Sequence, residues 1–343
     1  MSPRNRLDDR VRAGGLRGLR LFITALDGYA LLVIAYLLLR LVAGEDFWPV
    51  ALANVFSAWL LLPDFAGLAV GLWRRRTPLI ALSGVGVSVF AWGYGALFLP
   101  QAAPPLSYTN PGTTLRVMTI NVYENDALSG AIEGVLRDSD ADLIGLEEVT
   151  PGQLNALRDD LADEYPYLVA RDSGIPERGL LSRYPVTEWE SLSGGTGRPP
   201  HLVATVDVAG RALRVIVAHS APPDLYRDGF HFGFQIDPRA APEIDAVVAA
   251  ATGGGPAVIL GDFNLSDQSD NYRRLTGAGL IDAFRAAGWG LGATWPADPP
   301  LPFPLVRIDY VWHTPDFYPL RAWTGPAWGS DHLPVVADLL WRE

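Results

Sequence analysis

The sequence predicts an α/β domain that is preceded by a region of transmembrane helices. Three observations predict it: long apolar runs confined to the first 100 residues, alternating strand-like and helix-like segments from residue 115 onward, and a change of charge between the two parts. The expected organisation is a membrane region at 1–100, a linker at 101–114 and a soluble domain at 115–343.

The N-terminal part contains three apolar runs. Residues 21–43 are long enough to span a bilayer, and residues 78–99 contain no charged side chain. The middle run, residues 47–73, is interrupted by Pro63 and Asp64, so it is either a span or a broken, re-entrant helix. A cleaved signal peptide does not explain three successive runs, and about three transmembrane helices are expected.

The distribution of arginine predicts the orientation. Six arginines precede the first run, three more occupy positions 74–76, and residues 101–114 contain none. Positive charge stays on the cytoplasmic side of a membrane. With three spans, the chain is therefore expected to be a multi-pass protein of the cell membrane whose soluble domain lies outside the cytoplasm.

The soluble domain is acidic and the chain contains no cysteine. Residues 101–343 hold seventeen arginines and thirty-two acidic residues, a charge of −15, which weighs against a general nuclease because a phosphate backbone repels an acidic surface. Without cysteine, disulfides, thiolate metal sites and cysteine nucleophiles are excluded. The remaining ligand types favour a hard ion such as Mg²⁺ over zinc.

The predicted elements of the soluble domain begin with a buried strand at 115–120 and a helix at 126–138 with one apolar face. A second strand follows at 141–146. Thr150 and Pro151 then start another helix, with threonine as the cap and proline in the first turn. The later elements are strands at 202–208, 213–220, 257–263, 308–313 and 335–341, a helix at 243–251, and loops at 253–255 and 296–305.

Polar side chains stand at one end of these strands. Any single one is explained as a turn residue or an exposed flank. Their repetition along one chain is better explained by an active site, because ligands and catalytic groups gather at strand ends. The residues are Asn121, Glu147, Glu148, His219, Asp262, Asn264, Asp309, Asp331 and His332.

Seven segments carry a resemblance to a known family: TINV, DLIGLEEV, LLSRYPV, AHS, GDFN, RIDYVW and GSDHLPV. Their order and spacing, over about residues 114–342, resemble the endonuclease/exonuclease/phosphatase superfamily, which includes deoxyribonuclease I and neutral sphingomyelinases. Each motif alone is weak, but the ordered set is specific. The resemblance implies a four-layered α/β sandwich of two mixed sheets flanked by helices. It also implies Mg²⁺-dependent hydrolysis of phosphoester or phosphoanhydride bonds.

The resemblance implies a site for Mg²⁺ or Mn²⁺. Glu148 matches the family's metal-binding glutamate, with Asn121 and Asp331 as further metal-site residues. Glu147 stands where the family usually has glutamine, which leaves two candidates for the ligand. Alignment on Val149 favours Glu148.

The same resemblance implies catalytic roles for five residues. Asp262 would orient or deprotonate the attacking water, and Asn264 would donate a hydrogen bond to the phosphoryl group. His332, oriented by Asp309, would meet the charge that develops on the phosphoryl group. His219 would donate a proton to the leaving oxygen.

Four further residues have no assigned role. His201 and His313 are expected to be structural or exposed, and His231 matches no motif. Arg178 either reaches a phosphate or is solvated.

The expected substrate is a lipid-linked phosphate or diphosphate of the cell envelope. A membrane anchor and an external, acidic domain favour a substrate held at the membrane. Two apolar or aromatic loops are expected at 228–234 and 299–305, and they either dip toward lipid or pack on the domain. The architecture also resembles actinobacterial membrane-anchored members of the superfamily related to the VanJ teicoplanin-resistance protein. The alternatives are a surface-tethered nuclease, which needs an arginine-lined groove, and an inactive binding or scaffold module.

Overall fold

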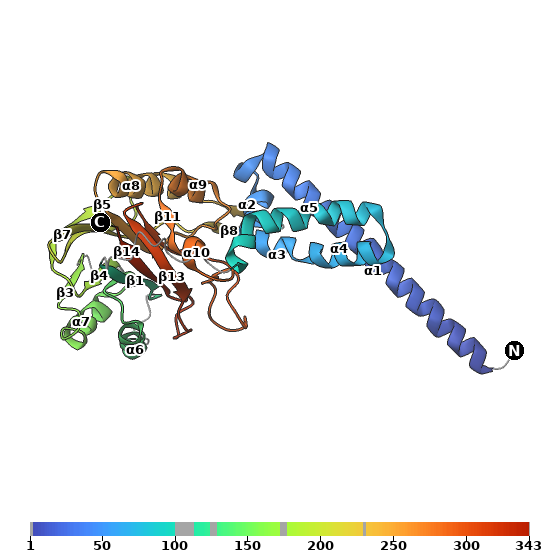
Figure 1. Cartoon of the computed structure of the whole chain (residues 1–343), viewed down its shortest axis with the longest axis horizontal. Coiled ribbons are helices and arrows are strands. Elements are labelled where there is room, and N and C mark those ends of the chain that lie inside the picture. Colours follow the sequence, from blue (N-terminus) through green and yellow to red (C-terminus); the bar gives the residue numbers. More distant parts are fainter. Residues whose placement is uncertain (1–2, 100–112, 124–128, 172–176, 229–230, 343) are drawn as a thin grey trace. The chain divides into compact units, whose positions relative to one another are not determined.

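The structure, a computed structural model, describes residues 3–99, 113–123, 129–171, 177–228 and 231–342 (Figure 1). Its two units are Met1–Ala96 and Leu97–Glu343. The predicted linker at 101–114 lies outside the described residues, except for Thr113 and Thr114, where the first strand begins.

The N-terminal unit is helical. Two of its helical segments are long and apolar enough to cross a membrane: Gly18–Val42, with a mean hydropathy of 2.1, and Thr77–Phe98, with 1.5. The middle run forms Trp48–Val55 and Ser57–Arg74, which meet at 86°, as in a broken span or a re-entrant loop. The elements are α1 (Pro3–Val42), η1 (Gly44–Asp46), α2 (Trp48–Val55), α3 (Ser57–Leu61), α4 (Pro63–Arg74), α5 (Thr77–Tyr94) and η2 (Gly95–Phe98).

The second unit contains two mixed six-stranded sheets. In the first sheet, β1 pairs in parallel with β2 and antiparallel with β14; in the second, β10 pairs in parallel with β7 and antiparallel with β12. The first sheet has the order β13 (Phe317–Thr324), β14 (Val335–Trp341), β1 (Thr114–Asn121), β2 (Leu143–Val149), β4 (Glu177–Ser182), β3 (Tyr167–Ala170). The second has the order β11 (Ile281–Asp282), β12 (Asp309–His313), β10 (Ala257–Asp262), β7 (Arg211–His219), β6 (His201–Val208), β5 (Val186–Leu192).

Helices cover the outer face of each sheet, as Figure 1 shows. The helices α6 (Ser129–Ser139) and α7 (Pro151–Asp160) pack on the first sheet, while α8 (Ala240–Thr252) and α9 (Asp270–Gly277) pack on the second. A short helix, α10 (Ala283–Ala287), follows β11. This order of layers confirms the predicted four-layered sandwich.

The period of two along a strand decides which residues enter the space between the sheets. In β1, Met118 and Ile120 belong to the core under α6 and α7, so Asn121 faces the second sheet. In β10, Ile259 belongs to the core under α8 and α9, so Leu260 faces the first sheet. The sheets approach closely, because a Cβ atom on Gly145 of β2 would lie 2.8 Å from Leu260 Cβ.

The seven predicted strands all form, and α7 begins at the predicted cap. Thr150 and Gln153 form a capping box, and Pro151 occupies the first turn. The predicted helix at 126–138 is α6, whose described part starts at Ser129. Elements of the second unit that were not predicted are β3, β4, β5, β8, β9, β11, β13, α9 and α10.

The predicted loop at 228–234 is wrong in part. This segment contributes to an antiparallel hairpin of β8 (Asp224–Asp228) and β9 (His231–Gln235). The hairpin is mostly exposed: all of β8 is exposed, and in β9 Phe232 is exposed while Gly233 and Phe234 are buried. The loops predicted at 253–255 and 296–305 contain no helix or strand.

Candidate active site

Five strands bring polar residues to one end of the space between the sheets. Asn121 is the last residue of β1 and is paired with Glu147 of β2. Asp262 is the last residue of β10 and is paired with His219 of β7 on one side and Asp309 of β12 on the other. All five side chains are buried. The pairing of the strands therefore gathers residues that are as far apart in sequence as Asn121 and Asp309.

Glu148 reaches this site through a distortion of its strand. Strict alternation would send it to the outer face, because Glu147 before it points inward. Instead the register of β2 against β4 shifts between Leu146 and Val149, and Glu148 has a φ of 52°, a left-handed conformation that is rare outside glycine. Its Oε1 accepts a hydrogen bond from Asn121 Nδ2 at 3.1 Å. Such strain is common at functional sites.

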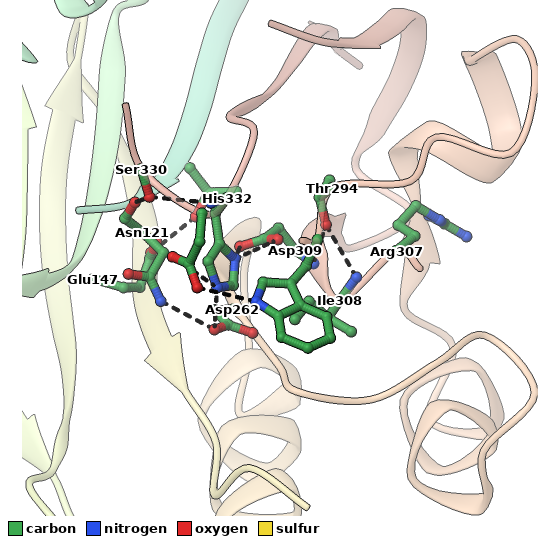
Figure 2. Close-up of polar contacts among 12 residues, drawn as sticks. Asn121, Glu147, Asp262, Thr294, Arg307, Ile308, Asp309, Ser330 and His332 are labelled. Atoms are coloured by element: carbon green, nitrogen blue, oxygen red, sulfur yellow. Dashed lines mark hydrogen bonds and ion pairs between the residues drawn. The ribbon is translucent and has the colours of Figure 1, made fainter. Parts of the chain in front are cut away.

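The carboxylate of Asp262 is held by two amide side chains. Asn121 Nδ2 donates to its Oδ2 at 3.1 Å (Figure 2). The backbone N–H of Asn264 donates to Asp262 Oδ1 at 2.9 Å, and Asn264 Nδ2 donates to Asp262 Oδ2 at 3.3 Å and to Ser220 O at 3.1 Å. His219 Nε2 lies 3.8 Å from Asp262 Oδ2 and 3.5 Å from Glu148 Oε1. Asp262 is thus at the centre of the cluster.

His332 lies on the other side of Asp262. Its Nδ1 donates to Asp309 at 3.0 Å, and its Nε2 lies 3.8 Å from Asp262 Oδ2. Figure 2 shows that Ser330 holds this segment against β1. Ser330 Oγ donates to Asn121 O at 2.9 Å and accepts from the backbone N–H of His332 at 3.1 Å. Ser330 was not singled out from the sequence, although it precedes the Asp-His pair directly.

Asp331 lies at the edge of the cluster, beside His332. Its Oδ2 accepts a hydrogen bond from Trp295 Nε1 at 3.1 Å. Its Oδ1 is buried without a hydrogen-bond partner and lies 4.0 Å from His332 Nε2. The metal-capable groups found in the described part of the chain join Glu148, His219 and Asp262, or Asp262, Asp309 and His332, so Asp331 belongs to neither.

Burial and neighbouring charges shift the pKa values of Asp262 and His332 away from their usual ranges. Burial and repulsion by Asp309 raise the pKa of the Asp262 carboxyl to about 7. Burial acts to lower the pKa of His332, but the carboxylates of Asp309 and Asp262 outweigh it and raise that pKa to about 10. His332 is therefore an imidazolium at neutral pH.

Burial shifts the pKa of two other groups of the site. Burial, Arg178 and Arg198 lower the pKa of His219 well below its usual value, so its imidazole carries no charge at neutral pH. Burial raises the pKa of Glu147 well above its usual value, and Glu147 Oε1 accepts a hydrogen bond from Thr119 at 2.8 Å. Glu147 and Glu148 are adjacent, yet only Glu148 is partly exposed and in contact with Asn121 and His219.

Two residues with no sequence-assigned role support His219. Arg178 is buried, not solvated, and its Nη2 donates to His219 O at 3.0 Å. His201 is also buried, and its Nδ1 accepts from the backbone N–H of His219 at 3.2 Å. His313 is buried in β12 beside Thr314, as a structural residue. The side chain of His231 lies outside the described residues.

The donor set fits a hard divalent ion. Ligand atoms of Glu148, His219 and Asp262 all lie within 4.8 Å of one another. The second group includes His332, whose Nδ1 is committed to Asp309, so the first group is the better match. Two carboxylates, together with the unpartnered Oδ1 of Asp331 nearby, suit the oxygen preference of Mg²⁺ or Mn²⁺.

The arrangement of these residues agrees with comparisons to known proteins. The model of the endonuclease/exonuclease/phosphatase family matches residues 118–332, which include every candidate site residue. The chain belongs to this family. Its members take their names from endonuclease, exonuclease and phosphatase activities, which all hydrolyse phosphoester bonds.

Individual relatives are distant. The protein YbhP of Escherichia coli is 24% identical, over 66% of this chain and 96% of its own length. An endonuclease/exonuclease/phosphatase structure from Bacteroides vulgatus matches with a TM-score of 0.55 at 22% identity, over 67% of this chain and 100% of its own. The mannosyl-6-phosphatase Bt3783 of Bacteroides thetaiotaomicron matches with a TM-score of 0.51 at 18% identity, over 66% and 100%. At these identities the structures establish the shared fold.

Metal affinity is expected to fall as the pH is lowered through about 7. Above that pH Asp262 is a carboxylate whose charge attracts the ion, whereas below it the carboxyl is neutral. The affinity can therefore fall by up to about tenfold per pH unit. Calorimetric titration with Mn²⁺ at pH 6 and pH 8 measures this difference, and Asp262→Asn should remove most of it. Equal affinity of the unmodified protein at both pH values would contradict the assignment of Asp262 to the ion.

Proposed function

We propose that this chain is a membrane-anchored, divalent-metal-dependent phosphohydrolase. Its catalytic domain acts outside the cytoplasm on a lipid-linked phosphate or diphosphate of the cell envelope. The observation that carries the proposal is the combination, in one chain, of an assembled carboxylate, amide and imidazole cluster with two or three helices apolar enough to cross a membrane.

The proposed reaction uses Asp262 as the base. Glu148, with Asn121 and Asp331 alongside and Asp262 next to it, would hold a divalent ion, whose positive charge would neutralise the phosphate and polarise the P–O bond. Asp262, fixed by Asn121 and Asn264, accepts a proton from the attacking water. The water oxygen bonds to phosphorus as the bond to the leaving oxygen breaks.

His332 and His219 interact with the negative charge that develops during this step. The His332 imidazolium, held by Asp309, and the amide of Asn264 stabilise negative charge on the phosphoryl oxygens. His219 is neutral in the free site, but the negative charge of a bound phosphate favours its protonation. Once protonated, His219 donates a proton to the leaving oxygen.

Exposed apolar side chains in loops that connect to the site support a substrate at the membrane surface. Trp295 donates to Asp331 at the edge of the site, and Leu301 and Phe303, which follow it in the same loop, are exposed. The β8–β9 hairpin, which follows His219 in the chain, exposes more: Leu225, Tyr226 and Phe232. Such side chains suit insertion at a lipid interface.

One assay tests the proposed function. The full-length protein in detergent, with Mg²⁺ or Mn²⁺, is offered lipid diphosphates, phospholipids and DNA in parallel. We expect phosphate release from the lipid phosphates to dominate. Preferential cleavage of DNA would replace the proposal with a surface nuclease, and inactivity on all three would support a binding module.

Replacing the exposed apolar side chains of the 296–305 loop is expected to impair activity on long-chain substrates but not on short-chain substrates. Leu301→Ser with Phe303→Ser removes two exposed apolar side chains while leaving the catalytic cluster intact. The KM for a long-chain lipid diphosphate should rise several-fold, at about 0.8 kcal/mol per buried CH₂ lost, while turnover of a short-chain soluble analogue stays unchanged. Trp189→Ser, an exposed site on β5, is the control. Equal losses of activity on both substrates would contradict the proposal that the substrate is a membrane lipid.

The orientation is tested separately. A reporter enzyme that is active only in the cytoplasm, fused to the C-terminus, is expected to be silent. Arginines at 74–76 and before residue 21 motivate this expectation. A strong cytoplasmic signal would place the catalytic domain on the inner side.

A further inference from the structure

A second charged cluster lies directly behind His219. It consists of Arg178 on β4, Arg198 in the segment before β6, and Glu243 on α8, and we refer to it as the arginine cluster. Nothing in the proposed hydrolytic step uses these side chains, although two of the three lie almost entirely inside the domain.

Direct contacts fix the arginine cluster to the backbone around His219. Arg178 Nη2 donates to His219 O at 3.0 Å. Glu243 Oε2 accepts from the backbone N–H of Ala221 at 2.8 Å, two residues further on. The Oε1 of the same carboxylate lies 3.4 Å from Arg198 Nε. Glu243 therefore places Arg198 beside the segment that carries His219.

The segment that carries Arg198 is clamped to α8. Thr196 Oγ1 donates to Glu243 Oε1 at 2.6 Å. Gly194 allows the close approach, because a Cβ atom there would lie 2.7 Å from Glu243 Cγ. A guanidinium on such a fixed segment loses little conformational freedom when it binds a ligand.

The guanidinium of Arg198 has N–H donors that are available to a ligand. Glu243 Oε1 lies 3.4 Å from its Nε without a hydrogen bond, and within the described residues neither terminal nitrogen of Arg198 makes a hydrogen bond. Its side chain is 19% exposed, whereas that of Glu243 is 3% exposed. A partly exposed guanidinium with free terminal N–H groups suits two oxygens of one phosphate.

The charges around the site are asymmetric. On one side of Asp262, His332 lies between Asp309 and Asp331. On the other side, Arg178 contacts His219 O, and Glu243 joins Arg198 to the backbone N–H of Ala221. His219 is also the proposed donor to the leaving oxygen. The arginine cluster therefore lies on the leaving-group side, where a guanidinium is better matched to a leaving group that is itself a phosphate, with two or more anionic oxygens, than to a single leaving oxygen.

We propose that the arginine cluster is an anion subsite that binds the inner, lipid-attached phosphate of a diphosphate substrate through Arg198. This inference rests on the proposed function and narrows its substrate class from phosphates in general to diphosphates. Water then attacks the terminal phosphorus, the bridging P–O bond breaks, and the products are inorganic phosphate and the lipid monophosphate. The proton lost by water goes to Asp262, and the bridging oxygen leaves as part of the monophosphate with a proton from His219.

The test compares two soluble substrates with the same alkyl group, a short-chain prenyl diphosphate and the corresponding monophosphate. The full-length protein in detergent with Mg²⁺ is assayed for phosphate release from each. Arg198→Gln is expected to lower kcat/KM for the diphosphate at least about tenfold more than for the monophosphate, the loss expected for charged hydrogen bonds. Arg198→Lys keeps the charge without the paired donors and should fall between.

A binding measurement gives an independent readout. Methylene diphosphonate, a diphosphate analogue that resists hydrolysis, should inhibit the unmodified protein, and its inhibition constant should rise about tenfold in Arg198→Gln. Arg239→Gln is the matched control, because Arg239 is an exposed arginine paired with Asp237. It should leave both activities and the inhibition constant unchanged.

The outcomes separate this inference from the proposed function. Hydrolysis of neither substrate by the unmodified protein would overturn the proposed function itself. Hydrolysis of the monophosphate alone would leave that function standing and overturn the subsite. Equal effects of Arg198→Gln on both substrates, with an unaltered melting temperature, would also overturn the subsite.

Discussion

Glu148→Gln is expected to abolish phosphate release, with a fall in kcat/KM of about 10³-fold or more. The substitution replaces an anionic oxygen that lies 3.1 Å from Asn121 Nδ2 and 3.5 Å from His219 Nε2 with a neutral amide. Loss of a bound ion removes several kcal/mol of stabilisation from the charge that develops on the phosphate. Initial rates over a range of Mg²⁺ concentrations, together with Mn²⁺ titration, measure both consequences.

Glu147→Gln is the matched control for this experiment. It makes the same chemical change one residue earlier, at a carboxyl that faces the interior and accepts a hydrogen bond from Thr119. Because burial raises the pKa of Glu147 and glutamine keeps the acceptor for Thr119, the variant should keep most of its activity. An inactive Glu147→Gln beside an active Glu148→Gln would move the ligand assignment to Glu147. Melting temperatures check that both variants fold.

The central strands could be predicted from the sequence because both of their faces are buried. β1, β7 and β10 read as nearly continuous apolar runs, the pattern of strands covered on both sides. β5 and β13 gave no such signal. β5 is mostly exposed, and β13 contains proline and arginine, so their strand conformation depends on pairing with a neighbour.

The site was predictable to the extent that strand ends determine it. Asn121, Asp262 and Asp309 follow from the position of a polar residue at the end of an apolar strand. The inward turn of Glu148 depends on a left-handed residue and a register shift, and neither is encoded in apolar spacing. Arg198 comes together with His219 only through Glu243 on a different element, so nothing in the local sequence indicates it.

His332→Ala is expected to lower kcat by about 10²-fold or more with little change in KM. The imidazolium lies 3.8 Å from Asp262 and is held by Asp309, so its charge acts mainly on the negative charge that develops during reaction. Steady-state kinetics on a short-chain soluble substrate measure the two constants separately. Normal turnover by this variant would remove His332 from the mechanism.

Asp309→Asn tests how His332 acquires its charge. Asp309 contributes to raising the pKa of His332 to about 10, so the unmodified protein keeps the imidazolium until the pH approaches that value. Removing the carboxylate lets His332 lose its proton at a lower pH, and the alkaline limb of the kcat profile should move toward neutrality. A purely structural role for Asp309 would lower kcat equally at every pH. A shifted limb therefore distinguishes a residue that sets the charge of His332 from one that only packs beside it.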